Sequence, residues 1–159
     1  MRTNVETLAA ILFGFLAAGD AAAGATVVCP ADAAPLVRLA AKEVARYIYV
    51  RTGALPAVSD HALGAETVEL SLDPALGPSR YALRSDGAAQ RIVGGDPLGA
   101  LYGAYRYAEK LGVRFYLHGD VIPDVRLEAL PKADEAGAPL FSVRGIQPFH
   151  DFPEGPDWW

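Results

Sequence analysis

Apolar residues recur at the spacing of an α-helix in two stretches of the chain. The first begins at Pro35 and ends near Gly53, with lysine, glutamate and arginine side chains on the opposite side. The second begins with Asp96 and Pro97, which suit an N-cap and a first helical turn, and ends at Gly112. Both patterns predict amphipathic helices. The expected buried positions are Leu36, Leu39, Ala40, Val44, Tyr47 and Ile48 in the first helix, and Leu98, Leu101, Tyr102, Tyr105, Ala108 and Leu111 in the second.

Short runs that are rich in β-branched or alternating apolar residues predict the strands. Asp86-Gly87 lies between two such runs and is a strong hairpin signal. We therefore expect the three middle strands to form an antiparallel meander. The predicted strands cover residues 26–29, 67–72, 80–84, 91–93 and 113–117, and residues 57–58 allow one more.

The order of these elements predicts an α+β fold, with a mostly antiparallel sheet and two helices on one face. This domain is expected to cover residues 25–132. Residues 119–137 are rich in Pro, Asp and Glu and predict a loop or linker with at most one short strand. A strand at residues 141–145 then opens another unit, so residues 133–159 are assigned to a linker and the first strand of a second domain.

The first 23 residues form a separate segment. Residues 8–19 are apolar, but this run is too short for a bilayer span of roughly twenty residues. Ala21 and Ala23 supply the small side chains that signal peptidase requires, with cleavage near Gly24. We therefore expect a signal peptide at residues 1–23 and a secreted or periplasmic bacterial protein. The alternative is an amphipathic first helix at residues 5–16.

Composition excludes some functions without choosing one. A hydrophobic content of 52% and a charged content of 21% indicate a chain that folds. The net charge is −5 and the basic residues are scattered, so binding to nucleic acid or to an anionic membrane is not expected. The densest basic group is a helical series that we expect to face water, namely Arg38, Lys42, Arg46 and Arg51.

Metal and cofactor chemistry also finds little support. The single cysteine, Cys29, excludes an internal disulfide and a multi-cysteine metal site, and we interpret it as a small buried hydrophobic residue. The histidines are widely separated along the chain. A zinc site would have to be assembled across a loop from His118, Asp120, His150 and Asp151, so no metal or other cofactor is expected.

The sequence Gly94-Gly-Asp-Pro-Leu-Gly99 lies at a strand-to-helix junction, where phosphate-binding loops are found. Asp96 would place a negative charge where the anion sits, and Pro97 removes an amide donor. We therefore predict a helix cap and tight packing instead. Gly99 and Gly103 each lower helix stability by up to ~1 kcal/mol relative to alanine, which favours a close approach to a neighbouring backbone.

Aromatic residues gather in two places. Those of the second helix and the strand after it are predicted to be core rather than a sugar-stacking platform. Those after residue 145 alternate irregularly with polar side chains, which suits a carbohydrate, because its C–H faces stack while its hydroxyls form hydrogen bonds. A capped strand with a Pro-rich loop is equally compatible. The candidate substrate-binding residues are Arg144, His150, Asp151 and Trp158.

Two stretches together resemble a known arrangement. Residues 92–116 contain, in this order, a glycine, a second glycine after a gap, the pair Tyr-Gly, an aromatic-rich helix and the run Leu-Gly-Val-Arg-Phe-Tyr. This resembles the signature of the small α+β domain that precedes the catalytic barrel in β-N-acetylhexosaminidases and α-glucuronidases. Residues 140–146, Leu-Phe-Ser-Val-Arg-Gly-Ile, are similar to the segment that leads into the first barrel strand of the same enzymes.

The resemblance implies a domain that packs beside a (β/α)8 barrel, whose active site lies at the carboxyl ends of its strands. The Arg of Arg-Gly binds hydroxyls of the terminal sugar in hexosaminidases, a role that the resemblance gives to Arg144. Residues 147–159 depart from the hexosaminidase pattern and lean toward the α-glucuronidase-like relatives. The paired catalytic carboxylates lie further along the barrel, so Asp151, Glu154 and Asp157 come too early and no catalytic residue is expected here.

The leading hypothesis is a non-catalytic N-terminal accessory domain of an exported glycoside hydrolase, truncated at the start of the barrel. The whole enzyme would act on terminal sugars or uronic acids of polysaccharides or glycans by carboxylate acid/base chemistry. The expected partners are the carbohydrate, reached through the barrel, and the barrel itself. The alternatives are a free-standing carbohydrate-binding module and a cell-envelope interaction domain.

Overall fold

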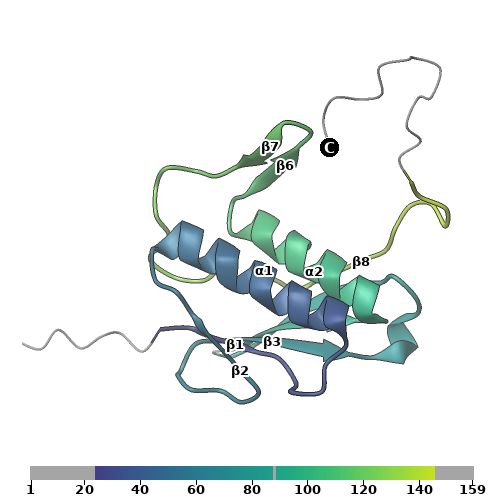
Figure 1. The fold of residues 1–159 in the computed structure, drawn as a ribbon, viewed down its shortest axis with the longest axis horizontal. Coiled ribbons are helices and arrows are strands. Elements are labelled where there is room, and N and C mark those ends of the chain that lie inside the picture. The colour runs from purple at the N-terminus through teal and green to yellow at the C-terminus, as the bar shows by residue number, and fades with distance from the viewer. Residues whose placement is uncertain (1–23, 88, 146–159) are drawn as a thin grey trace, which may run out of the picture.

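The computed structural model describes residues 24–87 and 89–145. Within these ranges two helices cover one face of a six-stranded sheet, and a separate two-stranded hairpin stands beside them (Figure 1). The predicted α+β class and the two helices on one face are confirmed. The helices are α1 (Pro35–Thr52) and α2 (Pro97–Lys110), and the strands are β1 (Thr26–Val28), β2 (Ala57–Ser59), β3 (Thr67–Leu72), β4 (Tyr81–Asp86), β5 (Ala89–Gly94), β6 (Arg114–Tyr116), β7 (Gly119–Val121) and β8 (Glu135–Gly137).

The sheet is mixed, and its strand order is β2-β1-β3-β5-β4-β8. The hairpin predicted at Asp86-Gly87 is confirmed, because β4 and β5 pair in antiparallel fashion across it. The predicted meander is wrong, because β3 pairs parallel with β5 and does not touch β4 in the sheet. The central position of β5 buries Gln90 and Ile92 completely, which a place at the edge would not do. The pairings of β1 with β2 and β3 are also parallel.

Small residues set the orientation of both helices. In α1 the predicted burial of Ala40, Val44, Tyr47 and Ile48 is confirmed, while Leu36 and Leu39, which we predicted to be buried, are 39% and 41% exposed. Of the residues predicted to be buried in the second helix, Ala108 and Leu111 are buried as expected. The other four, Leu98, Leu101, Tyr102 and Tyr105, are only half-buried. The buried side of α2 consists of Gly99, Ala100, Gly103, Ala104, Tyr107 and Ala108.

Glycines at the start of α2 allow this close packing. A Cβ atom added at Gly99 would lie closer than 3.0 Å to the backbone oxygen of Arg80, and one at Gly94 equally close to the backbone nitrogen of Ala100. The side chain of Asp96 caps the helix, because its Oδ1 accepts a hydrogen bond from the N–H of Gly99 at 2.6 Å. The predicted cap and the predicted close approach are both confirmed.

Arg51 is buried, although its helical spacing predicted a position in water. It is 4% exposed, whereas Arg38, Lys42 and Arg46 are exposed as expected. Its guanidinium donates from Nε to the carbonyl of Leu111 at 2.7 Å and from Nη1 to the carbonyl of Pro123 at 2.5 Å. The cation is therefore used to join the end of α1 to the end of α2 and to the loop beyond β7.

The strand predicted at residues 113–117 forms β6, but it pairs with β7 rather than joining the sheet. The hairpin is held against the helices by aromatic packing, with the ring of Phe115 edge-on to Tyr47 and Tyr105 at centroid distances of 5.6 and 5.3 Å. The hydroxyl of Tyr47 also donates to Asp120 at 2.5 Å. Of the aromatics predicted to be core, Tyr107 is fully buried and Tyr116 is exposed.

The chain after β6 differs from the prediction in two places. Residues 119–137, predicted to contain at most one short strand, contain two, β7 and β8, and β8 pairs antiparallel with β4 at the edge of the sheet. Residues 141–145 were predicted to be a strand, but the structure shows bends and extended chain there. A strand needs a partner for its backbone hydrogen bonds, and no strand within the described residues lies beside this segment. Among the described residues, no helix combines the length and apolarity needed to cross a membrane.

Candidate functional site

Arg144 is the one predicted substrate-binding residue that the structure describes. Its side chain is exposed and donates to the carbonyl of Phe141 and, more weakly at 3.5 Å, to the hydroxyl of Ser79. The guanidinium carbon lies 5.7 Å from the ring centroid of Tyr102, a cation–π distance. His150, Asp151 and Trp158 lie outside the described residues, as does the predicted signal peptide at 1–23.

A cavity of about 440 Å³ opens beside Arg144. A second hollow of about 270 Å³ adjoins it, because Ala138, Pro139 and Arg144 line both. The larger cavity is lined by two arginines and two serines among its residues, and the smaller one is lined by two tyrosines. The remaining lining residues are Pro78, Ser79, Arg80, Phe141 and Ser142 in the first, and Tyr81 and Tyr102 in the second.

The wall formed by Ser79 and Arg80 is fixed by the cap of α2. Ser79 has a positive φ of 58°, a backbone conformation that needs support outside glycine. The second carboxylate oxygen of Asp96 supplies it by accepting from the N–H of Ser79 at 2.9 Å, while the first caps the helix. The N–H of Gly95 donates to the carbonyl of Arg80 at 2.8 Å. One aspartate therefore holds both the helix start and the turn at the cavity.

The opposite wall, residues 138–144, follows β8, which is clamped to α2 by ion pairs. Glu135 accepts from Arg106 at 2.5 Å and pairs with Lys110 at 2.7 Å. Hydrogen bonds from Arg106 and then Lys110 lower the pKa of Glu135 to about 2, so its carboxylate stays ionised in mildly acidic solution. The pKa of Arg106 is raised in turn, chiefly by its hydrogen bond to Glu135. The clamp fixes where the chain leaves the sheet.

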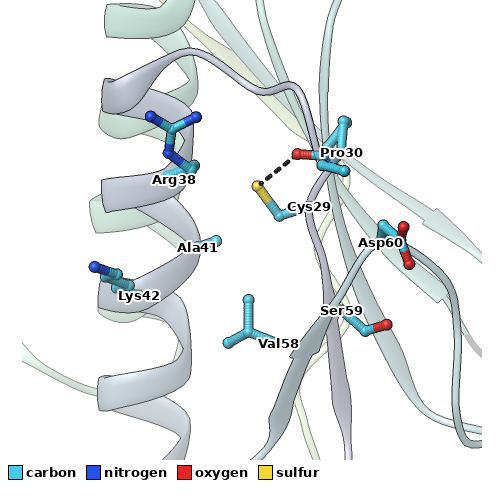
Figure 2. A pocket seen from close by; sticks show the side chains of 9 residues that line it. Cys29, Pro30, Arg38, Ala41, Lys42, Val58, Ser59 and Asp60 are labelled. Carbon is cyan, nitrogen blue, oxygen red and sulfur yellow. Dashed lines mark hydrogen bonds between the residues drawn. The ribbon is translucent and has the colours of Figure 1, made fainter.

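A third hollow, of about 300 Å³, lies between α1 and the edge of the sheet (Figure 2). The thiol of Cys29 and the side chain of Val58 lie between the strands and the helix, which presents Arg38 and Lys42. Burial raises the pKa of the thiol, and Arg38 opposes this only in part. A protonated thiol is a poor nucleophile, and Cys29 is buried, as predicted.

Two residues of the alternative zinc set, His118 and Asp120, form other contacts, and His150 and Asp151 lie outside the described residues. Asp120 accepts from Tyr47 and pairs with Arg46 at 3.5 Å, and the ring of His118 stacks on Tyr116. Within the described ranges no three His, Cys, Asp or Glu residues are grouped so that they could hold a metal ion.

Sequence reasoning missed that Ser79, Arg80, Tyr81 and Tyr102 surround Arg144. Tyr102 was predicted to be core, and Arg80 and Tyr81 were predicted only as the start of a strand. The juxtaposition depends on β8 pairing with β4, which brings residues 138–144 back beside the start of β4. No local motif signals such a pairing.

The fold is shared with a part of known enzymes. No protein-family model matches the sequence, and neither does any curated protein. Among solved structures, the GH20 β-N-acetylhexosaminidase of Streptomyces coelicolor A3(2) matches 75% of this chain and 23% of its own, at 17% identity and a TM-score of 0.51. The Streptomyces plicatus N-acetyl-β-hexosaminidase matches 72% of this chain and 21% of its own, at 17% identity and a TM-score of 0.49.

The GH115 4-O-methyl-α-glucuronidase BtGH115A matches 57% of this chain and 14% of its own, at 18% identity and a TM-score of 0.49. The chain thus spans less than a quarter of the length of each of these structures. At these identities the likeness concerns the fold alone. The structural neighbours are glycoside hydrolases, and the chain has the α+β fold of a segment found in the Streptomyces coelicolor enzyme.

Proposed function

We propose that this chain is a non-catalytic N-terminal accessory domain of an exported glycoside hydrolase that acts on terminal sugars or uronic acids. The observation that carries the proposal is the fold shared with the Streptomyces coelicolor hexosaminidase, which takes in three quarters of this chain but less than a quarter of the enzyme. A match of that kind supports a module of a larger hydrolase. The sequence resemblance at residues 92–116 and 140–146 agrees with it.

The exposed apolar residues support a role in packing against a catalytic barrel. Leu140, Phe141 and Val143 follow the clamped strand β8 and are largely exposed, and Leu117 at the tip of the β6–β7 hairpin is 98% exposed. Figure 1 shows the hairpin and the segment after β8 on the same side of the sheet as the helices. Large apolar side chains exposed on neighbouring parts of a surface often mark an interface. The barrel is its proposed occupant.

The carboxylates near the candidate site are already engaged in structure. Glu135 is paired with two cations, and both oxygens of Asp96 accept backbone hydrogen bonds. Glycosidases need two carboxyl groups facing a shared substrate, one of them able to give up a proton. The described residues do not offer such a pair around the cavity, so the chemistry is assigned to the barrel.

The purified 159-residue chain is therefore expected to show no turnover of 4-nitrophenyl β-N-acetylglucosaminide or 4-nitrophenyl α-glucuronide. The assay should run at high protein concentration with a known hexosaminidase as a positive control. A rate above the blank that disappears in Asp151→Asn or Glu154→Gln would overturn the assignment of catalysis to the barrel.

A free-standing carbohydrate-binding module is the second candidate. The cavity beside Arg144 and Tyr102 favours it, since tyrosine rings and a guanidinium are suited to sugar binding. The two candidates differ in whether the protein continues into a barrel, because a binding module is complete without one.

A further inference from the structure

Two arginines line the larger cavity, and no carboxylate does. Arg80 comes from the turn before β4 and Arg144 from the segment after β8, and the other residues that line the cavity are neutral. The side chain of Arg80 forms no hydrogen bond or ion pair with any described residue. By contrast, Arg46, Arg91 and Arg106 are each paired with carboxylates. The cavity therefore contains positive charge that the described part of the protein leaves unneutralised.

We propose that this cavity binds the carboxylate of an acidic sugar, a hexuronate, with Arg80 and Arg144 as its cationic ligands. This inference rests on the proposed function and names the substrate class. The guanidinium group matches a carboxylate in geometry, because its planar fork can donate two parallel hydrogen bonds. A neutral sugar would fill the space but would leave both cations without a counter-charge.

The adjoining hollow suits the body of the same sugar. Tyr81 and Tyr102 line it, and Arg144 borders both spaces, so a ligand held by its carboxylate reaches the tyrosine rings. Aromatic rings stack on the C–H faces of a sugar while polar groups fix its orientation. Together the two spaces distinguish a uronate from an inorganic anion, which would use the arginines alone.

The exposure of both arginines limits the strength of the interaction. Charges that face water are screened by salt over about 10 Å at 0.1 M ionic strength. We therefore expect weak binding of a monosaccharide that weakens further as salt is raised. The selectivity for a uronate over its neutral analogue is the decisive quantity, rather than the affinity itself.

The test is a titration of the ¹⁵N-labelled full chain with sodium D-glucuronate, D-glucose and sodium sulfate at constant ionic strength, followed by amide chemical shifts. Glucuronate should shift the amides of Ser79, Arg80 and Tyr102, and glucose should not. Arg80→Gln should weaken glucuronate binding about tenfold or more, which corresponds to about 1.4 kcal/mol. Arg84→Gln, in the middle of β4 and outside the cavity, should bind as the unaltered chain does.

Three results would overturn the inference. The first is equal binding of glucose and glucuronate, and the second is an unchanged affinity of Arg80→Gln for glucuronate. The third is binding of sulfate as tight as that of glucuronate, which would indicate a general anion site. Absence of glucuronate shifts in a chain whose amide spectrum shows it folded counts against it as well. Each of these leaves the accessory-domain proposal standing, because that proposal depends on the barrel and not on this cavity.

Discussion

Gly99→Ala is expected to lower the free energy of unfolding by about 2 to 3 kcal/mol, as overpacking of a tight contact does. Alanine is the better helix former by up to ~1 kcal/mol, so an exposed site would give the opposite sign. At this position the added Cβ would come closer than 3.0 Å to the carbonyl oxygen of Arg80, which is backbone and cannot move aside cheaply. Urea denaturation followed by circular dichroism measures the difference.

Gly103→Ala is the matched control on the next turn of the same helix. There the added Cβ would meet the Cγ2 atom of the buried Ile92 at 2.7 Å, which is a milder overlap than the one at Gly99 and involves a side chain rather than backbone. We expect a smaller loss, of about 1 kcal/mol. A variant Gly99→Ala that is as stable as the unaltered protein, or more stable, would show that α2 does not lie against the turn at Arg80.

Arg51→Met is expected to cost about 3 kcal/mol of stability, because hydrogen bonds to a charged group are worth about 1.5 to 3 kcal/mol each. Methionine keeps the length and the apolar packing of the side chain but leaves the carbonyls of Leu111 and Pro123 without this donor. The loss should appear as a lower denaturation midpoint in urea with an unchanged slope.

Lys42→Met on the same helix is the control for this substitution. Lys42 is exposed and forms no hydrogen bond or ion pair with the described residues, so its replacement should change stability by less than about 0.5 kcal/mol. Equal effects of the two substitutions would mean that Arg51 faces water, as its helical spacing alone suggested.

Local signals predicted the elements well, and they failed where distant segments meet. Pro35, Gly53 and Asp96 mark the helix ends in the sequence and do so in the structure, since capping involves only neighbouring residues. The predicted burial of Val44, Tyr47 and Ile48 in α1 is confirmed, but most of the large residues predicted to be buried in α2 are only half-buried, and glycine and alanine line its buried side instead. Small residues let backbones approach closely, and a scale of hydrophobicity does not register that advantage.

The sheet order and the candidate site depend on pairings that no local pattern encodes. Residues 67–72 and 81–86 are neighbours in the chain, yet β5 lies between them, and this central place buries Gln90 and Ile92 on one side of the strand while Arg91 on the other side stays exposed. Arg51 looked like one more surface cation, since its acceptors come from residues 60 and 72 positions further along. Arg144 was predicted from a motif, whereas its neighbour Arg80 emerged only from the pairing of β8 with β4.

The accessory-domain proposal is tested most directly by reading the gene beyond codon 159. The account predicts that the frame continues for several hundred codons, with alternating strand and helix patterns and a pair of carboxylates placed after barrel strands. A stop codon immediately after Trp159 would contradict it and would leave a free-standing domain with a sugar-sized cavity.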